Sequence, residues 1–141
     1  MPRINNYTFN IDTMTAFEGD TGPYLQYAHA RVCSIRRKAG LTDEELRSAD
    51  FSLLTEQHAV NIVRLLAQWP DIVQTTLRTL EPTTVLGYLF KMTHELSRSY
   101  DHLQVVGSER EVMRARMALY DAARTVLGNG MRMLGLTPVE R

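Results

Sequence analysis

The stretch that decides the fold is Gly22-Pro23-Tyr24-Leu25-Gln26-Tyr27-Ala28-His29-Ala30-Arg31-Val32-Cys33-Ser34-Ile35-Arg36-Arg37-Lys38-Ala39-Gly40. It predicts one helix of about five turns. Pro23 suits a first helical position, where its missing N–H costs no hydrogen bond, and Thr21 or Asp20 can cap that turn. Gly40 offers the left-handed residue that commonly ends a helix. The last turn carries three cations, which the helix dipole favours there: Arg36, Arg37 and Lys38.

Two rows of side chains run along this predicted helix. One has the three- and four-residue spacing of a buried face and consists of Leu25, Ala28, Val32 and Ile35. The neighbouring row, with Ser34 between its members, carries two phenols and two cations: Tyr24, Tyr27, Arg31 and Lys38. Phenol rings can stack on bases, and arginine can pair with phosphates or base edges. Half-buried rim tyrosines beside solvated cations have the same spacing, so spacing alone leaves both interpretations open.

Length and composition indicate one globular domain. A chain of 141 residues can bury one core, and its 44% hydrophobic and 23% charged content is that of a soluble protein. The formal net charge is zero, so any contact with nucleic acid must come from a local patch. No apolar run approaches the roughly 18 residues of a membrane span, so we expect no membrane association and an intracellular location. The single cysteine, Cys33, cannot form an internal disulfide.

Helical periodicity continues through the rest of the chain, without the alternation of strands. Further helices are predicted at residues 10–18, 42–48, 56–68, 71–80, 82–103 and 108–134. Pro70 is expected to separate the helix at residues 56–68 from the helix at residues 71–80, and Ser108 to cap the helix at residues 108–134. We expect the turn at residues 50–54 to bury Phe51 and Leu54. The sum is an all-α bundle of about five to seven helices.

Two long motifs at opposite ends carry a family resemblance. Phe17-Glu18-Gly19-Asp20-Thr21-Gly22-Pro23-Tyr24-Leu25-Gln26-Tyr27-Ala28-His29-Ala30-Arg31 resembles the junction where arginyl-tRNA synthetases pass from their catalytic core to a C-terminal, DALR-type anticodon-binding domain. Asn129-Gly130-Met131-Arg132-Met133-Leu134-Gly135-Leu136-Thr137-Pro138-Val139-Glu140-Arg141 resembles the end of that domain. Residues 49–54 and 81–85 resemble eukaryotic, especially fungal, members. The resemblance implies the helical bundle of class I synthetase anticodon-binding domains.

The resemblance implies a domain division and a function. Residues 1–20 correspond to the tail of the synthetase core or its connecting segment, and residues 21–141 to the anticodon-binding domain. The implied function is binding of the tRNA-Arg anticodon stem-loop in support of arginylation. The implied partners are that stem-loop and the catalytic core, with the chain a monomer, in the cytoplasm and also in mitochondria. The alternative is a free-standing helical module of the same fold that mediates protein interaction or dimerisation.

Site residues follow from the resemblance position by position. Tyr24, Tyr27 and Arg31 match positions that contact splayed anticodon-loop bases and the backbone, and Tyr100 resembles the matching aromatic on a later helix. Lys38 is a candidate phosphate contact together with Arg36 and Arg37, with a solvated helix end as the alternative. Family members usually end Val-Glu-Arg-Met, with the terminal Met near the anticodon loop. This sequence ends at Arg141, which becomes a candidate contact and puts full anticodon affinity in doubt.

Catalytic motifs are not found in the sequence. It holds no His-Ile-Gly-His-like element, no P-loop and no dinucleotide-binding glycine fingerprint. The resemblance places ATP and Mg²⁺ in a catalytic domain outside this chain, so we expect no catalytic residue, no cofactor and no aminoacylation by the chain alone. His94 and His102 are eight residues apart, but they lack a second carboxylate at metal-ligand spacing, so no metal site is expected.

Overall fold

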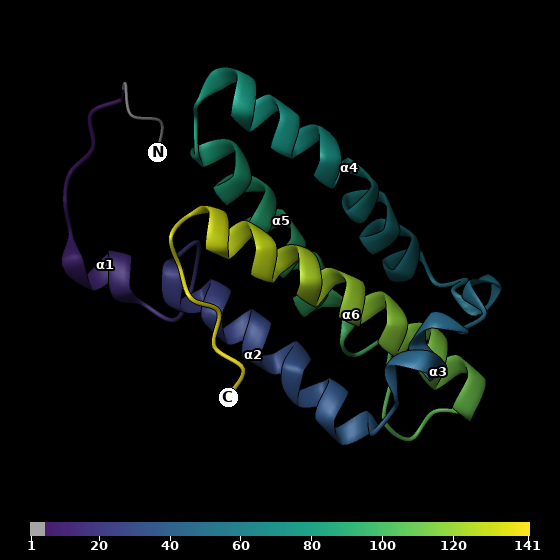
Figure 1. Ribbon diagram of the computed structural model, residues 1–141. Coiled ribbons are helices and arrows are strands. Elements are labelled where there is room, and N and C mark those ends of the chain that lie inside the picture. The colour runs from purple at the N-terminus through teal and green to yellow at the C-terminus, as the bar shows by residue number, and fades with distance from the viewer. Residues whose placement is uncertain (1–4) are drawn as a thin grey trace.

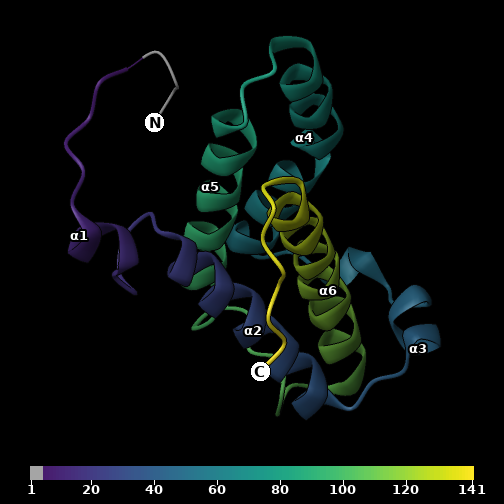
Figure 2. The same ribbon diagram turned by 60° about the vertical axis from the view of Figure 1, so that its left-hand side comes forward.

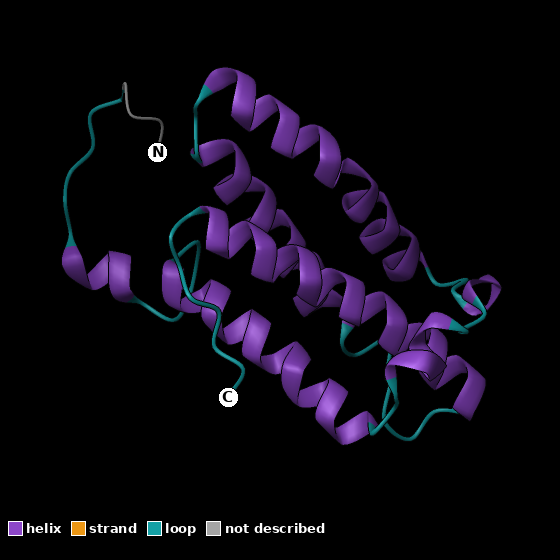
Figure 3. Cartoon of the chain, viewed as in Figure 1, coloured by secondary structure: helices purple, strands orange, loops and turns teal. Residues whose placement is uncertain are grey.

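The computed structural model describes residues 5–141, and within that range it contains six α-helices and no strand (Figure 3). The predicted all-α fold is therefore confirmed, with a helix count inside the expected range. Figure 1 labels the helices, and their bounds are α1 (Ile11–Thr15), α2 (Gly22–Ala39), α3 (Asp43–Arg47), α4 (Gln57–Thr79), α5 (Thr83–Ser99) and α6 (Arg110–Met133). A single 3-10 turn, η1 (Phe51–Leu53), precedes α4. Residues 1–4, the start of the predicted core tail, lie outside the described residues.

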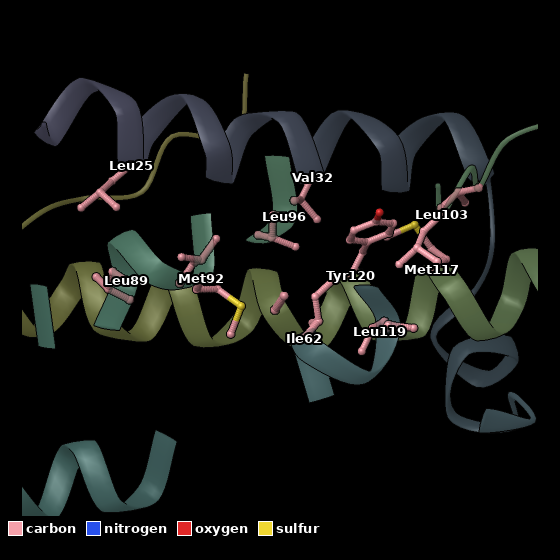
Figure 4. Packing of buried hydrophobic residues seen from close by; sticks show 14 of the residues in the cluster. Leu25, Val32, Ile62, Leu89, Met92, Leu96, Leu103, Met117, Leu119 and Tyr120 are labelled. Carbon is pink, nitrogen blue, oxygen red and sulfur yellow. The ribbon is translucent and has the colours of Figure 1, made fainter. Parts of the chain in front are cut away.

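The four long helices form the bundle, and α6 contacts the other three. Figure 4 shows how their side chains converge: Leu25 and Val32 come from α2, Ile62 from α4, Leu89, Met92 and Leu96 from α5, and Met117, Leu119 and Tyr120 from α6. The predicted buried row of α2 is confirmed, because Leu25, Ala28 and Val32 are buried and Ile35 packs against the core. Short α1 stands apart from the bundle and touches only α2 among the helices of residues 5–141 (Figure 2).

Both ends of α2 form as its sequence predicts. The Thr21 hydroxyl accepts a hydrogen bond from the Tyr24 N–H at 3.2 Å, and Pro23 stands in the first turn. Gly40 ends the helix with φ +63°, a left-handed conformation that costs glycine little. The position and length of α2 are therefore set by local sequence, before any tertiary contact.

Pro70 does not break the chain into two helices, and that prediction is wrong. Helix α4 runs unbroken through Pro70 for 23 residues. Proline removes one backbone hydrogen bond and crowds the preceding turn. Leu66, Trp69 and Ile72 pack against the core on both sides of the proline. This packing against α5 and α6 outweighs the local cost.

Two further expectations are corrected at turns. Phe51 is 57% exposed, because the Asp50 carboxylate accepts from the Ser52 N–H at 2.9 Å and fixes a turn that aims Phe51 outward. Leu54 packs against the core as predicted. Helix α6 is capped by the Glu109 carboxylate, which accepts from two N–H groups of the first turn, and not by Ser108.

Helices α5 and α6 approach closely at Gly130. A Cβ atom at that position would lie 2.6 Å from Leu89 Cδ2, and Leu89 is fully buried. At Gly87, on the exposed side of α5, an added Cβ would meet no atom within 4 Å. Gly87 and Gly130 therefore differ in the space that an added methyl group would find.

This difference yields a paired stability test. Gly87→Ala should raise the free energy of unfolding by up to about 1 kcal/mol, because alanine is the better helix former. Gly130→Ala gains the same propensity but forces a methyl group onto Leu89, which costs about 1–3 kcal/mol. We expect Gly130→Ala to be the less stable variant in urea unfolding. Equal stabilities would contradict the close approach of α5 and α6.

Candidate nucleic-acid interface

Helix α2 and the start of the α5–α6 connection bring four predicted residues onto one surface. Tyr27 is 52% exposed, and Arg31 and Lys38 follow on later turns of the same side of α2. The Arg31 guanidinium lies 4.1 Å from the centroid of the Tyr100 ring, which is a cation–π contact. Arg31 Nη1 is 3.5 Å from the Tyr27 hydroxyl, which accepts. Arg31 thus stacks on the Tyr100 ring and hydrogen-bonds to the Tyr27 hydroxyl, and we call these three residues the aromatic–cation stack.

The Tyr100 ring is a rigid base for this stack. It packs against the Tyr120 ring at 5.6 Å between centroids, and the Tyr120 hydroxyl and the Ser99 hydroxyl lie 2.8 Å apart. Burial raises the pKa of Tyr100 above its ordinary value, so its phenol stays neutral at physiological pH. Arg31 therefore contacts Tyr100 through the face of a neutral ring and not through a charged oxygen.

A cleft of about 350 Å³ opens beside the aromatic–cation stack, between α2 and residues 100–106. Helix α2 contributes Arg31, Ser34, Ile35 and Lys38 to its lining, and the other side is lined by Tyr100, residues 103–106 and Tyr120 of α6. The cleft thus combines two cations, a hydroxyl, the Gln104 amide and apolar surface. Such a mixture suits a nucleotide, whose phosphate needs positive charge and whose base needs an apolar face and a few polar contacts.

Tyr24 lies differently from Tyr27. Its hydroxyl hydrogen-bonds with the Ser97 hydroxyl at 2.9 Å, and its ring is tilted against His94 at 6.0 Å. His94 in turn pairs with Asp20 at 2.9 Å. Tyr24 is therefore a half-buried rim residue that joins α2 to α5, whereas Tyr27 offers an exposed ring. The interpretation as a rim tyrosine therefore describes Tyr24, whereas the Tyr27 ring is exposed at the surface.

The comparison with protein families agrees with this geometry. The family model of the DALR anticodon binding domain matches residues 25–141. The chain belongs to the DALR anticodon-binding domain family. The relatives include the cytoplasmic arginine–tRNA ligase of Saccharomyces cerevisiae, 59% identical over 99% of this chain and 23% of that protein. The probable cytoplasmic arginine–tRNA ligase of Schizosaccharomyces pombe is 56% identical over 99% of the chain and 22% of that protein.

Solved structures show the same fold. The arginyl-tRNA synthetase of Plasmodium falciparum superposes with a TM-score of 0.86 at 25% identity, over 100% of this chain and 25% of that one. This DALR domain therefore spans about a quarter of the length of the proteins it resembles, and the expected similarity to fungal members is confirmed.

The end of the DALR domain does not join the aromatic–cation stack. The tail, residues 134–141, crosses α2 (Figures 1 and 2), where Arg37 donates to the Glu140 carbonyl at 2.7 Å and His29 Nδ1 lies 2.8 Å from the Val139 carbonyl. At about 100° per residue, His29 lies on the opposite side of α2 from Tyr27 and Arg31, and Arg37 lies about 80° round the helix from Tyr27 and about 120° from Arg31. Of the predicted contacts, the structure groups Tyr27, Arg31, Lys38 and Tyr100, whereas it sets Arg141 apart from them.

Sequence reasoning missed the cleft wall of the DALR domain. Gln104, Val105 and Val106 belong to no helix, and a connecting segment has no periodicity that marks which side chains line a site. The only cue is Gly107-Ser108, a turn signal at the end of the segment, and Gly107 adopts φ +93°.

Neither a metal site nor a spanning helix occurs in the part of the chain that the structure describes. Residues 5–141 contain no group of three His, Cys, Asp or Glu side chains placed to hold a metal ion. None of the helices in that range is long and apolar enough to cross a membrane.

The buried phenol of Tyr120 gives stability a pH dependence of definite sign. Burial raises the pKa of Tyr120 to about 12, whereas an unfolded tyrosine ionises near about 10. Between these values the folded protein keeps a proton that the unfolded chain has lost, so the free energy of unfolding falls as pH rises. Tyr120→Phe should reduce this decline without abolishing it, because the pKa of Tyr88 is also raised to about 12. Urea unfolding from about pH 9 to about pH 11 measures the decline, and an unchanged slope in the variant would refute the assignment.

Proposed function

We propose that this DALR domain binds the anticodon stem-loop of tRNA-Arg within an arginyl-tRNA synthetase. The observation that carries the proposal is the aromatic–cation stack, in which the Arg31 guanidinium lies over Tyr100 beside the cleft and donates to the hydroxyl of exposed Tyr27. Proteins read single-stranded RNA loops by stacking splayed bases on aromatic rings and arginine planes, and by hydrogen bonds to base edges. The names of the relatives, arginine–tRNA ligases, support the choice of RNA.

One anticodon-loop nucleotide fits the proposed mode of binding. The Arg31 guanidinium already covers one face of Tyr100, so a base that enters here stacks on the guanidinium and extends the stack. The Ser34 hydroxyl and the Gln104 amide, which line the cleft, can then meet polar atoms on the base edge. Lys38 stands further along the same cleft and supplies charge for a phosphate.

Binding of this kind depends on local charge. Because the formal net charge of this chain is zero, its overall charge does not attract a polyanion. With Arg31 and Lys38 as the two phosphate-reaching cations, the logarithm of the association constant should fall against the logarithm of salt concentration with a slope of about −1.4. Lys38→Ala should make that slope shallower by about 0.7.

The rest of the synthetase would supply the chemistry. We propose that arginylation occurs in a catalytic core joined to this domain, that ATP and Mg²⁺ act there, and that anticodon binding energy helps the distant acceptor end react. Residues before α2 support such a junction, because five large apolar side chains there are exposed: Tyr7, Phe9, Ile11, Met14 and Phe17. Residues 1–20 would then be the connecting segment, and one copy of the chain would act in the cytoplasm, with mitochondria a second compartment.

Loss of the Tyr27 ring tests the proposal. We expect this chain to bind a tRNA-Arg anticodon stem-loop with a Kd of about 10⁻⁴ to 10⁻⁶ M at physiological salt. Tyr27→Ala should weaken binding by about 5- to 150-fold, because stacking of one base contributes about 1–3 kcal/mol. Fluorescence anisotropy with a labelled stem-loop measures both values.

Two controls make the result specific. Tyr7→Ala removes a phenol of similar exposure, 58% against 52%, outside the stack and should bind like the original chain. A stem-loop with a changed anticodon should bind more weakly, and Tyr27→Ala should lose that preference. Equal binding of both stem-loops by the unaltered chain would reject anticodon recognition and favour a protein-interaction module of the same fold.

A further inference from the structure

The wall of the cleft, residues 103–106, belongs to no helix and needs support from elsewhere. Its main chain is tied to α5 only at its start, where the Leu103 N–H donates to the Ser99 carbonyl at 2.7 Å. Leu103 and Val105 are buried, while Gln104 and Val106 are exposed at the cleft. The position of the wall relative to α2 sets the width of the cleft. Whatever fixes the wall therefore controls how a nucleotide would fit.

Arg116 of α6 fixes the wall from behind. Its Nη1 donates to the Gln104 carbonyl at 2.8 Å and to the Ser108 hydroxyl at 3.2 Å. That hydroxyl itself donates to the Gln104 carbonyl at 2.6 Å, so two donors meet on one main-chain oxygen of the wall. The other terminal nitrogen of Arg116, Nη2, forms an ion pair with Glu56, the residue that precedes α4. One guanidinium thus joins α6, α4 and the wall.

The Arg116–Glu56 pair is ionised and largely shielded from water. The Arg116 side chain is 15% exposed and that of Glu56 is 30% exposed. Burial opposes the charge of Glu56, but the hydrogen bond from Arg116 keeps the pKa of Glu56 below its ordinary value. Charge-assisted bonds of this kind are stronger than neutral ones, and the planar fork of arginine suits two partners at once.

A second contact holds the same segment to α4. The His102 ring is stacked on the His58 ring, with 4.6 Å between centroids and 16° between planes. His58 Nδ1 lies 2.9 Å from a Glu95 carboxylate oxygen, to which Asn61 also donates at 3.2 Å. Leu103 follows His102 directly, so the entry to the wall is anchored on α4 and its middle on Arg116.

We propose that Arg116, held by Glu56, is a positioning residue for RNA binding that sets the wall of the cleft against α2. The proposal rests on the proposed function. Arg116 does not line the cleft, and its terminal nitrogens already bond to Gln104, Ser108 and Glu56. It acts through the Gln104 main chain, and the nucleotide would touch Arg31, Lys38 and Gln104 instead.

Two substitutions with opposite changes of charge test this role. Arg116→Gln removes a positive charge, and Glu56→Gln removes a negative one while leaving the shape of the side chain intact. If Arg116 positions the wall, both variants weaken binding of the anticodon stem-loop, because apparent Kd rises as the competent fraction of molecules falls. We expect a rise of about fivefold for Arg116→Gln and a smaller rise for Glu56→Gln, whose amide oxygen still accepts a weaker bond. Tighter or unchanged binding by Glu56→Gln would overturn the proposal, since general electrostatics alone predicts tighter binding.

Arg114 provides the matched control on the same helix. Its side chain is 19% exposed and bonds to Glu111, to Ser48 and to the Glu45 carbonyl, so it ties α3 to α6 and not the wall. Arg114→Gln loses the same charge and a similar number of bonds, yet it should bind the stem-loop like the original chain. The salt slope of Arg116→Gln should equal that of the original chain, because Arg116 meets no phosphate. Equal weakening by Arg114→Gln, or a shallower slope for Arg116→Gln, would overturn the proposal.

Amide hydrogen exchange separates this proposal from the proposed function, because it needs no RNA. Arg116→Gln and Glu56→Gln should speed exchange of the Leu103 and Ser108 N–H groups, while core amides of α5 keep their protection. Unchanged exchange at Leu103 and Ser108 would reject the positioning role even if binding falls. Faster exchange in a chain that binds no stem-loop would reject the proposed function, and the role in RNA binding with it. A thermal melt by circular dichroism confirms that each variant is folded.

Discussion

The buried face of α2 is the constraint on which the candidate interface depends. Leu25, Ala28 and Val32 are held against α5 and α6, and this fixes the rotation of the helix about its axis. Side chains at Tyr27, Arg31 and Lys38 lie about 100° around the axis from that face. They therefore emerge at the edge of the bundle, next to Tyr100. A rotation of α2 by one residue would turn Arg31 away from Tyr100 and separate the two walls of the cleft.

Preorganisation is the second property of this surface. Tyr100 is supported by Tyr120, whose hydroxyl is paired with Ser99, and the opposite wall is fastened by Arg116. Side chains that are already ordered lose little conformational entropy when a ligand binds. The formal net charge of this chain is zero, so overall charge would not draw an RNA toward it. In the proposed function, the ordered stack, the cleft and the local charges of Arg31 and Lys38 would have to hold the RNA.

Local signals explain what the sequence predicted well. Thr21, Pro23 and Gly40 act within a few residues, and the apolar spacing of α2 shows which side is buried. The failures have two causes, one tertiary and one local. Packing of Trp69 and Ile72 carries α4 through Pro70, and one Asp50 hydrogen bond turns Phe51 outward. Residues 103–106 and Arg116 could not be found from the sequence, because their roles depend on contacts between segments that periodicity does not register. Tyr100 was predicted from the family resemblance alone, because it lies outside α2 and the spacing within α2 says nothing about it.

The most direct measurement is a map of amide chemical shifts in the ¹⁵N-labelled chain as an anticodon stem-loop is added. The account predicts the largest changes at residues 27–38 of α2 and residues 100–106, which form the stack and the cleft. Helix α4 and the tail at residues 137–140 should change little, because α4 lies across the bundle from α2 (Figure 1) and the tail bonds to His29 and Arg37, which point in other directions around α2 than Tyr27 and Arg31. Changes concentrated on α4 or on the tail, with residues 27–38 unaffected, would contradict the central claim that the flank of α2 is the RNA-binding surface.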